Sequence, residues 1–461
     1  MRGAATRVTD GSIRMIVQRI SAAVTAALLV LGALSFIALP LAGAQPPPAT
    51  TVPREMIGMV IRDPWYEFGT HPAYPNQPNY IAQERMGQIL AEAGVRWVRV
   101  EFLVRDRGAG TFAEQIARYD YFINDVAPRY GLTVMGLLGF GLVDIDPRDP
   151  AYGLIARTGT DPIYGGGVNP YMRLWLDRAL QIMNRYQGGV HAYEILNEQN
   201  RLPAEQGFAG GEGIDPVLTG RLHTKLYRCF KRNECDHRSD DPAWRAGVTL
   251  VIGGLHPRGS EILLPSGRRS MSDRDYLVEV YTTEPFSGYF SATGSYPAEA
   301  LGYHPYPAEI RLAAPVEEEV GRIDQRLELL RLRLRQALQA TSPAAAEIPL
   351  WITEIGYNVA YLQQTSAGQA AFLRTVYRQM AARRDVAVVF WFKYEDFPPL
   401  SGPGAQHWGI VRIPFIEDPR CPGGACYDPG GEPVFRRGSY LALRELAGLP
   451  VEQRFMPLAG R

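Results

Sequence analysis

Short apolar segments alternate with longer amphipathic segments along most of the chain, and this alternation restricts the fold more than any other feature. Such a pattern is typical of parallel strands joined by crossover helices. Eight strands are expected, at 57–61, 96–101, 132–138, 190–196, 248–253, a segment ending at 302–304, 349–353 and 386–391. Eight strand–helix pairs predict an α/β fold, a (β/α)8 TIM barrel that forms a single domain with enlarged loops.

The amphipathic segments predict the helices between these strands. They cover about 80–93, 112–130, 171–186, 217–230, 273–282, 316–340, 367–382 and 438–446. A doubly wound open sheet is the alternative, but it would place a glycine-rich phosphate turn after an early strand, and no G-x-G-x-x-G follows the first two. Residues 401–437 are rich in Pro and Gly and predict a long loop after the eighth strand.

The N-terminal segment has the order of a secretory signal. Four arginines precede an apolar run over 20–41, and Ala42-Gly43-Ala44 offers a small-residue cleavage site. Residues 1–44 are therefore expected to be a signal peptide of a secreted or extracytoplasmic protein. A retained membrane anchor is the alternative, because the run is long enough to span a bilayer. Residues 45–54 predict a Pro/Thr-rich linker, and residues 55–461 the folded domain.

Charge and cysteine content narrow the partners. Lys+Arg and Asp+Glu both number 48, so the chain lacks the basic excess of a nucleic-acid-binding protein. The four cysteines form two close pairs, which predict Cys229–Cys235 and Cys421–Cys426 disulfides in an exported protein. A zinc site is the alternative, but neither pair has the two-residue spacing of a zinc knuckle. The seven histidines are scattered, which disfavours a metal-dependent barrel hydrolase.

Two glutamates follow strands whose ends should meet at the barrel mouth. Asn197-Glu198 comes directly after the fourth strand, and Glu354 ends the apolar seventh strand. Either could be an ordinary turn or cap residue, yet a carboxylate ending so apolar a run is costly to desolvate without a partner or a task. Barrel enzymes keep their chemistry at the carboxyl ends of the strands. Together the two carboxylates match the pair that a retaining glycosidase requires.

This arrangement resembles clan A glycoside hydrolases, and leans towards families 39 and 5. The resemblance extends in order over the folded part of the chain. Gln199 departs from it, because proline is common at that position in the clan. Further matching positions are Arg99 near the end of the second strand, His304 and Tyr306 after the sixth, and Trp391 at the end of the eighth.

The resemblance implies a retaining O-glycoside hydrolase whose substrate is a carbohydrate and which needs no metal or organic cofactor. It makes Glu354 the nucleophile and Glu198 the acid/base, with Asn197 binding the sugar 2-hydroxyl. A transglycosylase with the same site, or an inactive carbohydrate-binding barrel, are the alternatives. The sugar, its linkage and the oligomeric state are not set by the sequence.

The remaining residues have roles implied in the same way. Arg99 would hold the nucleophile, although pairing with Glu101 is its structural alternative. His304 and Tyr306 would contact the nucleophile and the sugar, although His304 could be a core histidine. Trp391 would form an aromatic floor beneath the reacting sugar. Residues 55–461 would then be the catalytic domain.

Overall fold

The computed structural model of the protein describes residues 51–61, 70–71, 74–103, 110–143, 159–201, 213–235, 242–263, 269–307, 315–338, 347–361, 364–396, 405–420 and 425–451. They belong to the compact unit Thr50–Arg461. The predicted signal peptide lies outside the described residues, and so does Cys421 of the predicted Cys421–Cys426 disulfide. Among the described helices, none is long and apolar enough to cross a membrane.

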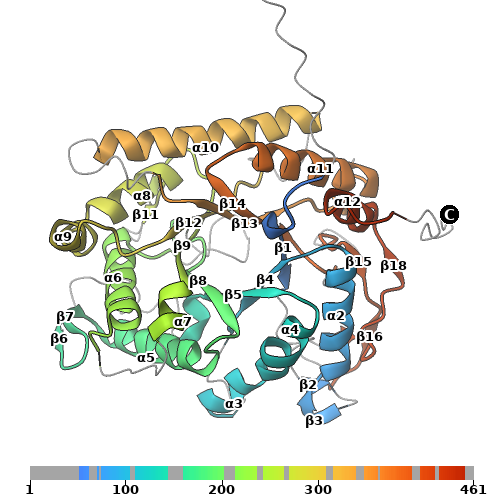
Figure 1. Ribbon diagram of the computed structural model, residues 1–461, viewed down its shortest axis with the longest axis horizontal. Coiled ribbons are helices and arrows are strands. Elements are labelled where there is room, and N and C mark those ends of the chain that lie inside the picture. The colour runs from blue at the N-terminus through green and yellow to red at the C-terminus, as the bar shows by residue number, and fades with distance from the viewer. Residues whose placement is uncertain are drawn as a thin grey trace, which may run out of the picture. The chain divides into compact units, whose positions relative to one another are not determined.

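Eight parallel strands close into a barrel, which confirms the predicted fold (Figure 1). Their order around the barrel is β1-β14-β13-β12-β9-β8-β5-β4, so barrel strands that follow one another along the chain lie side by side. Their bounds are β1 Ile57–Ile61, β4 Trp97–Glu101, β5 Thr133–Leu138, β8 Val190–Ile195, β9 Thr249–Leu255, β12 Ala300–Tyr303, β13 Leu350–Gly356 and β14 Val386–Phe392.

The strands are buried on both faces, which explains why they are near-continuous apolar runs. Alternate residues build two separate apolar clusters. The cluster inside the barrel includes Val60, Met135, Ala192 and Phe390. The larger cluster lies between the strands and the surrounding helices and takes the intervening residues of each strand, such as Met59. The barrel centre is therefore packed below the mouth, and the charged inward residues Arg99 and Glu194 meet above this packed centre.

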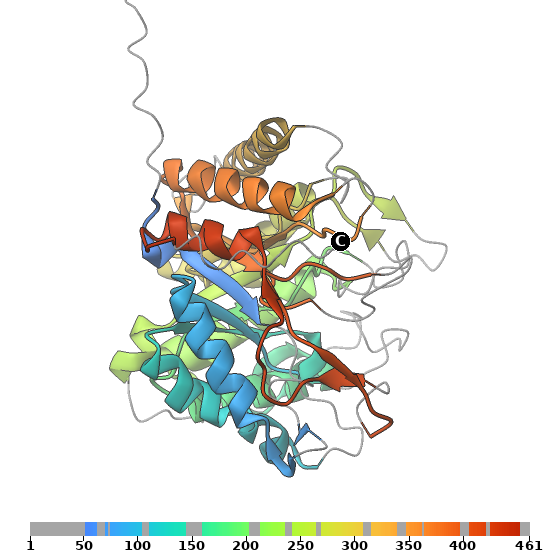
Figure 2. The ribbon, with the colours of Figure 1, turned by 90° about the vertical axis from the view of Figure 1, so that its right-hand side faces the viewer.

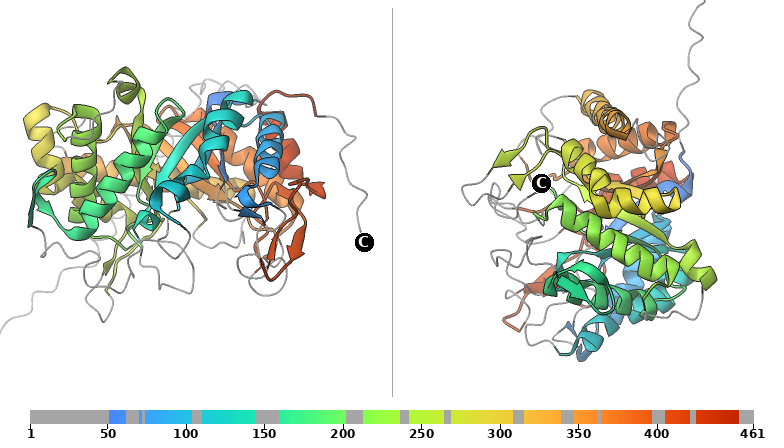
Figure 3. Two further views of the ribbon diagram at one scale, coloured as in Figure 1. Left: turned by 90° about the horizontal axis from the view of Figure 1, so that it is seen from below. Right: turned by 90° about the vertical axis from the view of Figure 1, so that its left-hand side faces the viewer.

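A ring of helices surrounds the strands. The helices are α2 Tyr80–Glu92, α3 Phe112–Ala117, α4 Ala127–Arg129, α5 Pro170–Arg185, α6 Pro216–Arg232, α7 Pro242–Gly247, α8 Asp273–Thr282, α9 Glu284–Thr293, α10 Val316–Leu338, α11 Ser366–Ala382 and α12 Gly438–Leu446. Short helical turns lie at Arg54–Met56, Phe122–Val126 and Phe140–Leu142. Figure 3 shows α5, α6, α8 and α9 side by side on one flank of the barrel.

Two predicted segments differ in the structure. The helix expected over 112–130 is divided into α3 and α4 by a π-helical turn at Phe122–Val126. The segment expected to be a plain loop contains paired short strands, β15 Val411–Arg412 with β18 Phe435–Arg436 and β16 Phe415–Glu417 with β17 Ala425–Tyr427. Backbone pairing over two or three residues leaves too short an apolar pattern to read from sequence.

The paired strands after β14 lie beside α2 (Figure 2). Arg85 of α2 bonds Glu432, and Arg436 bonds Glu92 at the other end of that helix. Three more short pairs decorate other loops: β2 Thr70–His71 with β3 Tyr74–Pro78, β6 Gly159–Asp161 with β7 Gly165–Val168, and β10 Ile262–Leu263 with β11 Arg269–Ser270.

The predicted Cys229–Cys235 disulfide is confirmed at the end of α6. The helix stops at Arg232 because Asn233 adopts a left-handed conformation, with φ of 55°, and turns the chain back. The bond therefore fastens a sharp turn to the last turn of the helix.

Candidate active site

Arg99 occupies the centre of the polar end of the barrel. It points inward from β4, is 2% exposed, and donates hydrogen bonds to Glu194 at 2.5 Å, Glu354 at 2.6 Å and Asn197 at 2.8 Å. Burial lowers the pKa of the guanidinium, but the charges of Glu194 and Glu354 outweigh burial and raise it. Arg99 thus contacts these groups from β8 and β13 rather than only its strand neighbour Glu101.

A β-bulge turns Glu354 towards the mouth. Between Ile352 and Ile355 the register of β13 shifts against β14, so that one extra residue is inserted. In a regular strand, the side chains of Thr353 and Glu354 would face opposite sides of the sheet. The extra residue breaks this alternation and lets the Glu354 side chain face the mouth. Tyr306 donates to the second oxygen of Glu354 at 3.1 Å. Both carboxylate oxygens are therefore held, one by Arg99 and one by Tyr306.

Glu198 lies in a tight turn that follows β8. Leu196 and Glu198 have positive φ angles, 69° and 45°, which non-glycine residues rarely adopt. The Glu198 amide donates to the carbonyl of Gly254 at 2.9 Å, which ties the turn to β9. Strained backbone held in this way is common where a side chain must be aimed.

Three basic side chains surround the Glu198 carboxylate. His304 Nδ1 lies 3.1 Å and His256 Nδ1 3.4 Å from Glu198 Oε1, and Arg201 Nη1 lies 3.4 Å from Oε2. Burial raises the pKa of Glu198, but His256 and His304 more than reverse this and hold the pKa well below its ordinary value. The geometry therefore favours the ionised form of this carboxyl.

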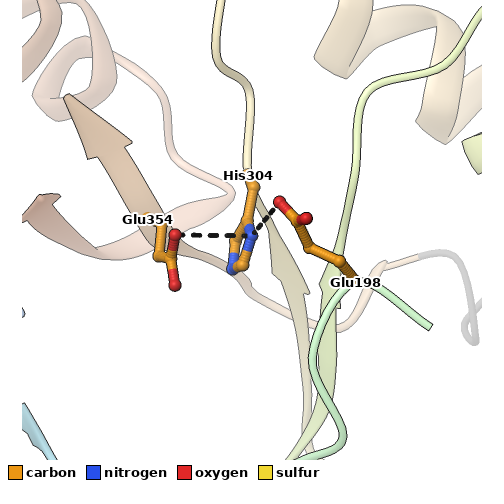
Figure 4. Close-up of side chains that lie close together, drawn as sticks. All are labelled: Glu198, His304 and Glu354. Atoms are coloured by element: carbon orange, nitrogen blue, oxygen red, sulfur yellow. Dashed lines mark hydrogen bonds and ion pairs between the residues drawn. The ribbon is translucent and has the colours of Figure 1, made fainter. Parts of the chain in front are cut away.

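His304 lies between the two glutamates (Figure 4). Its Nδ1 is 3.1 Å from Glu198 Oε1 and 3.9 Å from Glu354 Oε2. Burial lowers the pKa of His304, but the charges of Glu354 and Glu198 raise it above its ordinary value. Gly254 makes room for the ring, because a Cβ there would lie 2.1 Å from His304 Nε2.

The two carboxylates are close together. One oxygen of Glu198, one of Glu354 and a ring nitrogen of His304 all lie within 4.8 Å of one another. Three such atoms could in principle bind a metal ion. Each carboxylate oxygen, however, already faces a protein donor: His304 and Arg201 for Glu198, Arg99 and Tyr306 for Glu354. This donor set favours a site that works with protons and hydrogen bonds.

The prediction for Trp391 is wrong. Its side chain is fully buried on the helix side of β14 and packs against Phe372 of α11, with ring centroids 6.2 Å apart. The alternation of the strand places Phe392 on the inside instead. Phe392 lies 5.5 Å from Trp408, and Trp408 lies 5.9 Å from Tyr306, measured between ring centroids. The aromatic surface next to Glu354 is therefore built by these three rings.

The structure brings together the other predicted residues, namely Arg99, Asn197, Glu198, His304, Tyr306 and Glu354. Sequence reasoning missed Glu194, which shares the inward face of β8 with Ala192 and is held by Arg99 and by the Gly254 amide. A charged residue one position before the end of an apolar strand was the available signal. It also missed Arg201 and His256, which lie in loops where no periodicity shows direction. Gln199 is fully buried and donates to the carbonyl of Gly253 at 3.0 Å.

Comparison with known proteins gives likeness only at the level of structure. No family model and no curated protein matches the chain. A family 39 glycoside hydrolase from Bacteroides cellulosilyticus WH2 superposes with a TM-score of 0.45 at 13% identity, over 86% of this chain and 65% of that one. The chain thus spans slightly less than two thirds of that enzyme.

Two further solved structures are similar to a comparable degree. A family 39 β-xylosidase from Caulobacter crescentus has a TM-score of 0.43 at 15% identity, over 88% of this chain and 73% of that one. An endo-laminarinase from Formosa Hel1_33_131 has a TM-score of 0.46 at 11% identity, over 78% and 83%. All three are glycoside hydrolases, the class that the sequence resembles. At these scores they carry no weight for activity or substrate.

Proposed function

We propose that the protein is a retaining O-glycoside hydrolase. The observation that carries this proposal is the pair of carboxylates at the barrel mouth, with oxygens of Glu198 and Glu354 within 4.8 Å of each other. Retaining enzymes hold their carboxyl groups about 5–5.5 Å apart, whereas inverting enzymes leave about 6.5–9.5 Å for a water molecule. The close pair supports the retaining mechanism.

In this proposal Glu354 is the nucleophile. Its carboxylate attacks the anomeric carbon, and the bond from that carbon to the leaving oxygen breaks. Arg99 and Tyr306 suit this role because they bind the ionised form of Glu354 and fix both of its oxygens. Asn197, whose amide oxygen accepts from Arg99, would turn its nitrogen to the sugar 2-hydroxyl.

Glu198 is the acid/base in the same proposal. It gives its proton to the leaving oxygen in the first step, then takes a proton from the water that displaces the Glu354 ester. The rings of Tyr306, Phe392 and Trp408 would contact the sugar bound against Glu354. We also infer that the protein acts outside the cytoplasm, which the Cys229–Cys235 disulfide supports.

Separate replacement of the two glutamates tests the proposal. Glu354→Ala should abolish turnover of every substrate in a panel of aryl glycosides and polysaccharides. Glu198→Ala should still form the glycosyl-enzyme from an aryl glycoside with a good leaving group, and added azide should restore its turnover as a glycosyl azide of retained configuration. A mechanism-based fluorosugar should label the peptide that contains Glu354. Labelling of Glu198, or full activity of both variants, would overturn the assignment. Product analysis separates hydrolysis from transfer to a second sugar.

A further inference from the structure

Two of the three cations around Glu198 are not needed to orient it. His304 already bonds Oε1, and the backbone amide of Glu198 fixes the turn. Arg201 adds a positive charge 3.4 Å from one carboxylate oxygen, from the end of the same turn, and His256 places a basic ring 3.4 Å from the other, from the loop after β9. A general acid must be protonated before it can act, and neighbouring cations oppose protonation. These two side chains therefore require another explanation.

Hydrogen bonds between two loops fix the positions of Arg201 and His256. Asn200 donates its side-chain amide to the His256 carbonyl at 2.9 Å and accepts from the His256 amide at 2.9 Å. The same asparagine binds Met271 through its backbone carbonyl and its side chain. The turn that carries Glu198 and Arg201 is thus fastened to the loop that carries His256, so the two cationic groups keep a set distance from the carboxylate.

Arg201 and His256 contact Glu198, the carboxylate that faces the leaving oxygen in the proposed mechanism. The nucleophile is on β13, and the aromatic rings that would contact its sugar lie at the ends of β12 and β14 and in the segment that follows β14. Glu198 follows β8, and His256 follows β9. A glycoside that spans the two carboxylates places its departing group next to Glu198, where these two side chains lie. The side chain of His256 is 26% exposed there.

We propose that Arg201 and His256 form a subsite for a leaving group that bears a negative charge, such as the carboxylate of a uronic acid or a sugar sulfate. This inference rests on the proposed function and names its substrate class. An anionic substituent would attract both cations towards itself, with charge-assisted hydrogen bonds that a neutral sugar lacks. Their hold on Glu198 would weaken at the same time, which restores its ability to carry the proton.

The consequence for pH follows from the charged groups that face Glu198 within the described part of the chain. These are Arg201 on its own turn, His256 after β9, His304 after β12, and Glu354 on β13, with Arg99 of β4 behind Glu354. The hydrogen bond and charge of His256 lower the pKa of Glu198, so a substrate whose anionic group draws His256 away should raise that pKa. Activity should then persist to higher pH for an anionic leaving group than for a neutral one.

Paired substrates test this inference. The sugar that gives the fastest turnover in the aryl glycoside panel is coupled to meta-carboxyphenol and to meta-carbamoylphenol, which are alike in size and differ in charge. We expect kcat/KM to favour the carboxylate by about tenfold or more at low salt, the gain of one charge-assisted hydrogen bond. The preference should fall as salt is added. Arg201→Gln and His256→Gln should each reduce it.

Arg258→Gln is the matched control, because it removes one positive charge from the same loop and its guanidinium bonds Ser260 rather than Glu198. It should keep the preference for the carboxylate. Equal kcat/KM for the two substrates in the wild type would overturn the inference, and so would a preference that survives in both Arg201→Gln and His256→Gln. If no glycoside in the panel is hydrolysed, it is the proposed function that fails, and the two failures are distinguishable.

Discussion

Replacing Arg99 tests how the site is held without any assumption about the substrate. Arg99→Met keeps an unbranched apolar stem and removes the charged guanidinium, which leaves Glu194 and Glu354 without the cation they contact at 2.5 and 2.6 Å. Breaking a buried ion pair from one side costs about 3–5 kcal/mol. The Glu194 side chain is wholly buried and that of Glu354 is 10% exposed. We therefore expect the free energy of unfolding to fall by about 4 kcal/mol.

Urea unfolding followed by tryptophan fluorescence measures this loss. Arg335→Met is the control, since Arg335 pairs with Glu347 where the two side chains are 45% and 62% exposed, and it should cost less than about 1 kcal/mol. Adding Glu194→Gln to Arg99→Met removes one unpaired buried charge. The double variant should therefore be more stable than Arg99→Met alone, because the two changes share one ion pair.

Acidic conditions should reduce the loss of unfolding free energy caused by Arg99→Met. In Arg99→Met, a buried carboxylate without its cation is costly, and protonation removes that unpaired charge. A group of that kind takes up a proton on folding, so the variant gains stability relative to the wild type as pH falls. A cost of less than about 1 kcal/mol for Arg99→Met, or a double variant whose losses simply add, would refute this account of the site.

Three further predictions concern other parts of the molecule. Phe392→Ala should raise KM for a glycoside and also lower stability, because Phe392 is only 5% exposed, whereas Trp391→Phe should lower stability and leave KM unchanged; steady-state kinetics separate the two. Cys229→Ser should cost about 2 kcal/mol in urea unfolding, because the lost disulfide closes a loop of only 6 residues. Glu198→Gln should destabilise the protein at low pH, and this loss should shrink as pH rises above about 6.5. Glu198 helps to raise the pKa of His304 in the folded protein. The pairing of charged His304 with Glu198 therefore stabilises the fold below the unfolded pKa of His304 and disappears as pH rises through its folded pKa.

Much of the fold could be predicted because parallel barrel strands are buried on both faces. Each of the eight strands is a run of apolar residues, and each predicted run overlaps its strand in the structure. Glycines also indicate where helices end: Gly94 follows α2 and Gly131 follows α4, with φ of 84° and 65°, which few other residues tolerate. The π-helical turn within 112–130 gave no such signal, since its residues suit an ordinary helix equally well.

The candidate site, like the fold, could be predicted only in part from the sequence. The sequence by itself determined which strand ends carry Arg99, Glu198, His304 and Glu354, because barrel topology brings all carboxyl ends of the strands to one mouth. It determined nothing about the direction of a side chain where the alternation of a strand is interrupted. The bulge in β13 turned Glu354 to the mouth, and the unbroken alternation of β14 turned Trp391 away from it.

Only the tertiary structure decided which charges meet. Arg201 and His256 reach Glu198 because Asn200 fastens two loops together, and Arg99 meets Glu194 because β4 and β8 face a shared interior from either side of β5. Such contacts join residues between 3 and 255 positions apart in the chain. Their energies depend on distance and burial, which no local pattern of residues records. The sequence therefore named the two carboxylates, and the folded barrel supplied the cations that set their charge.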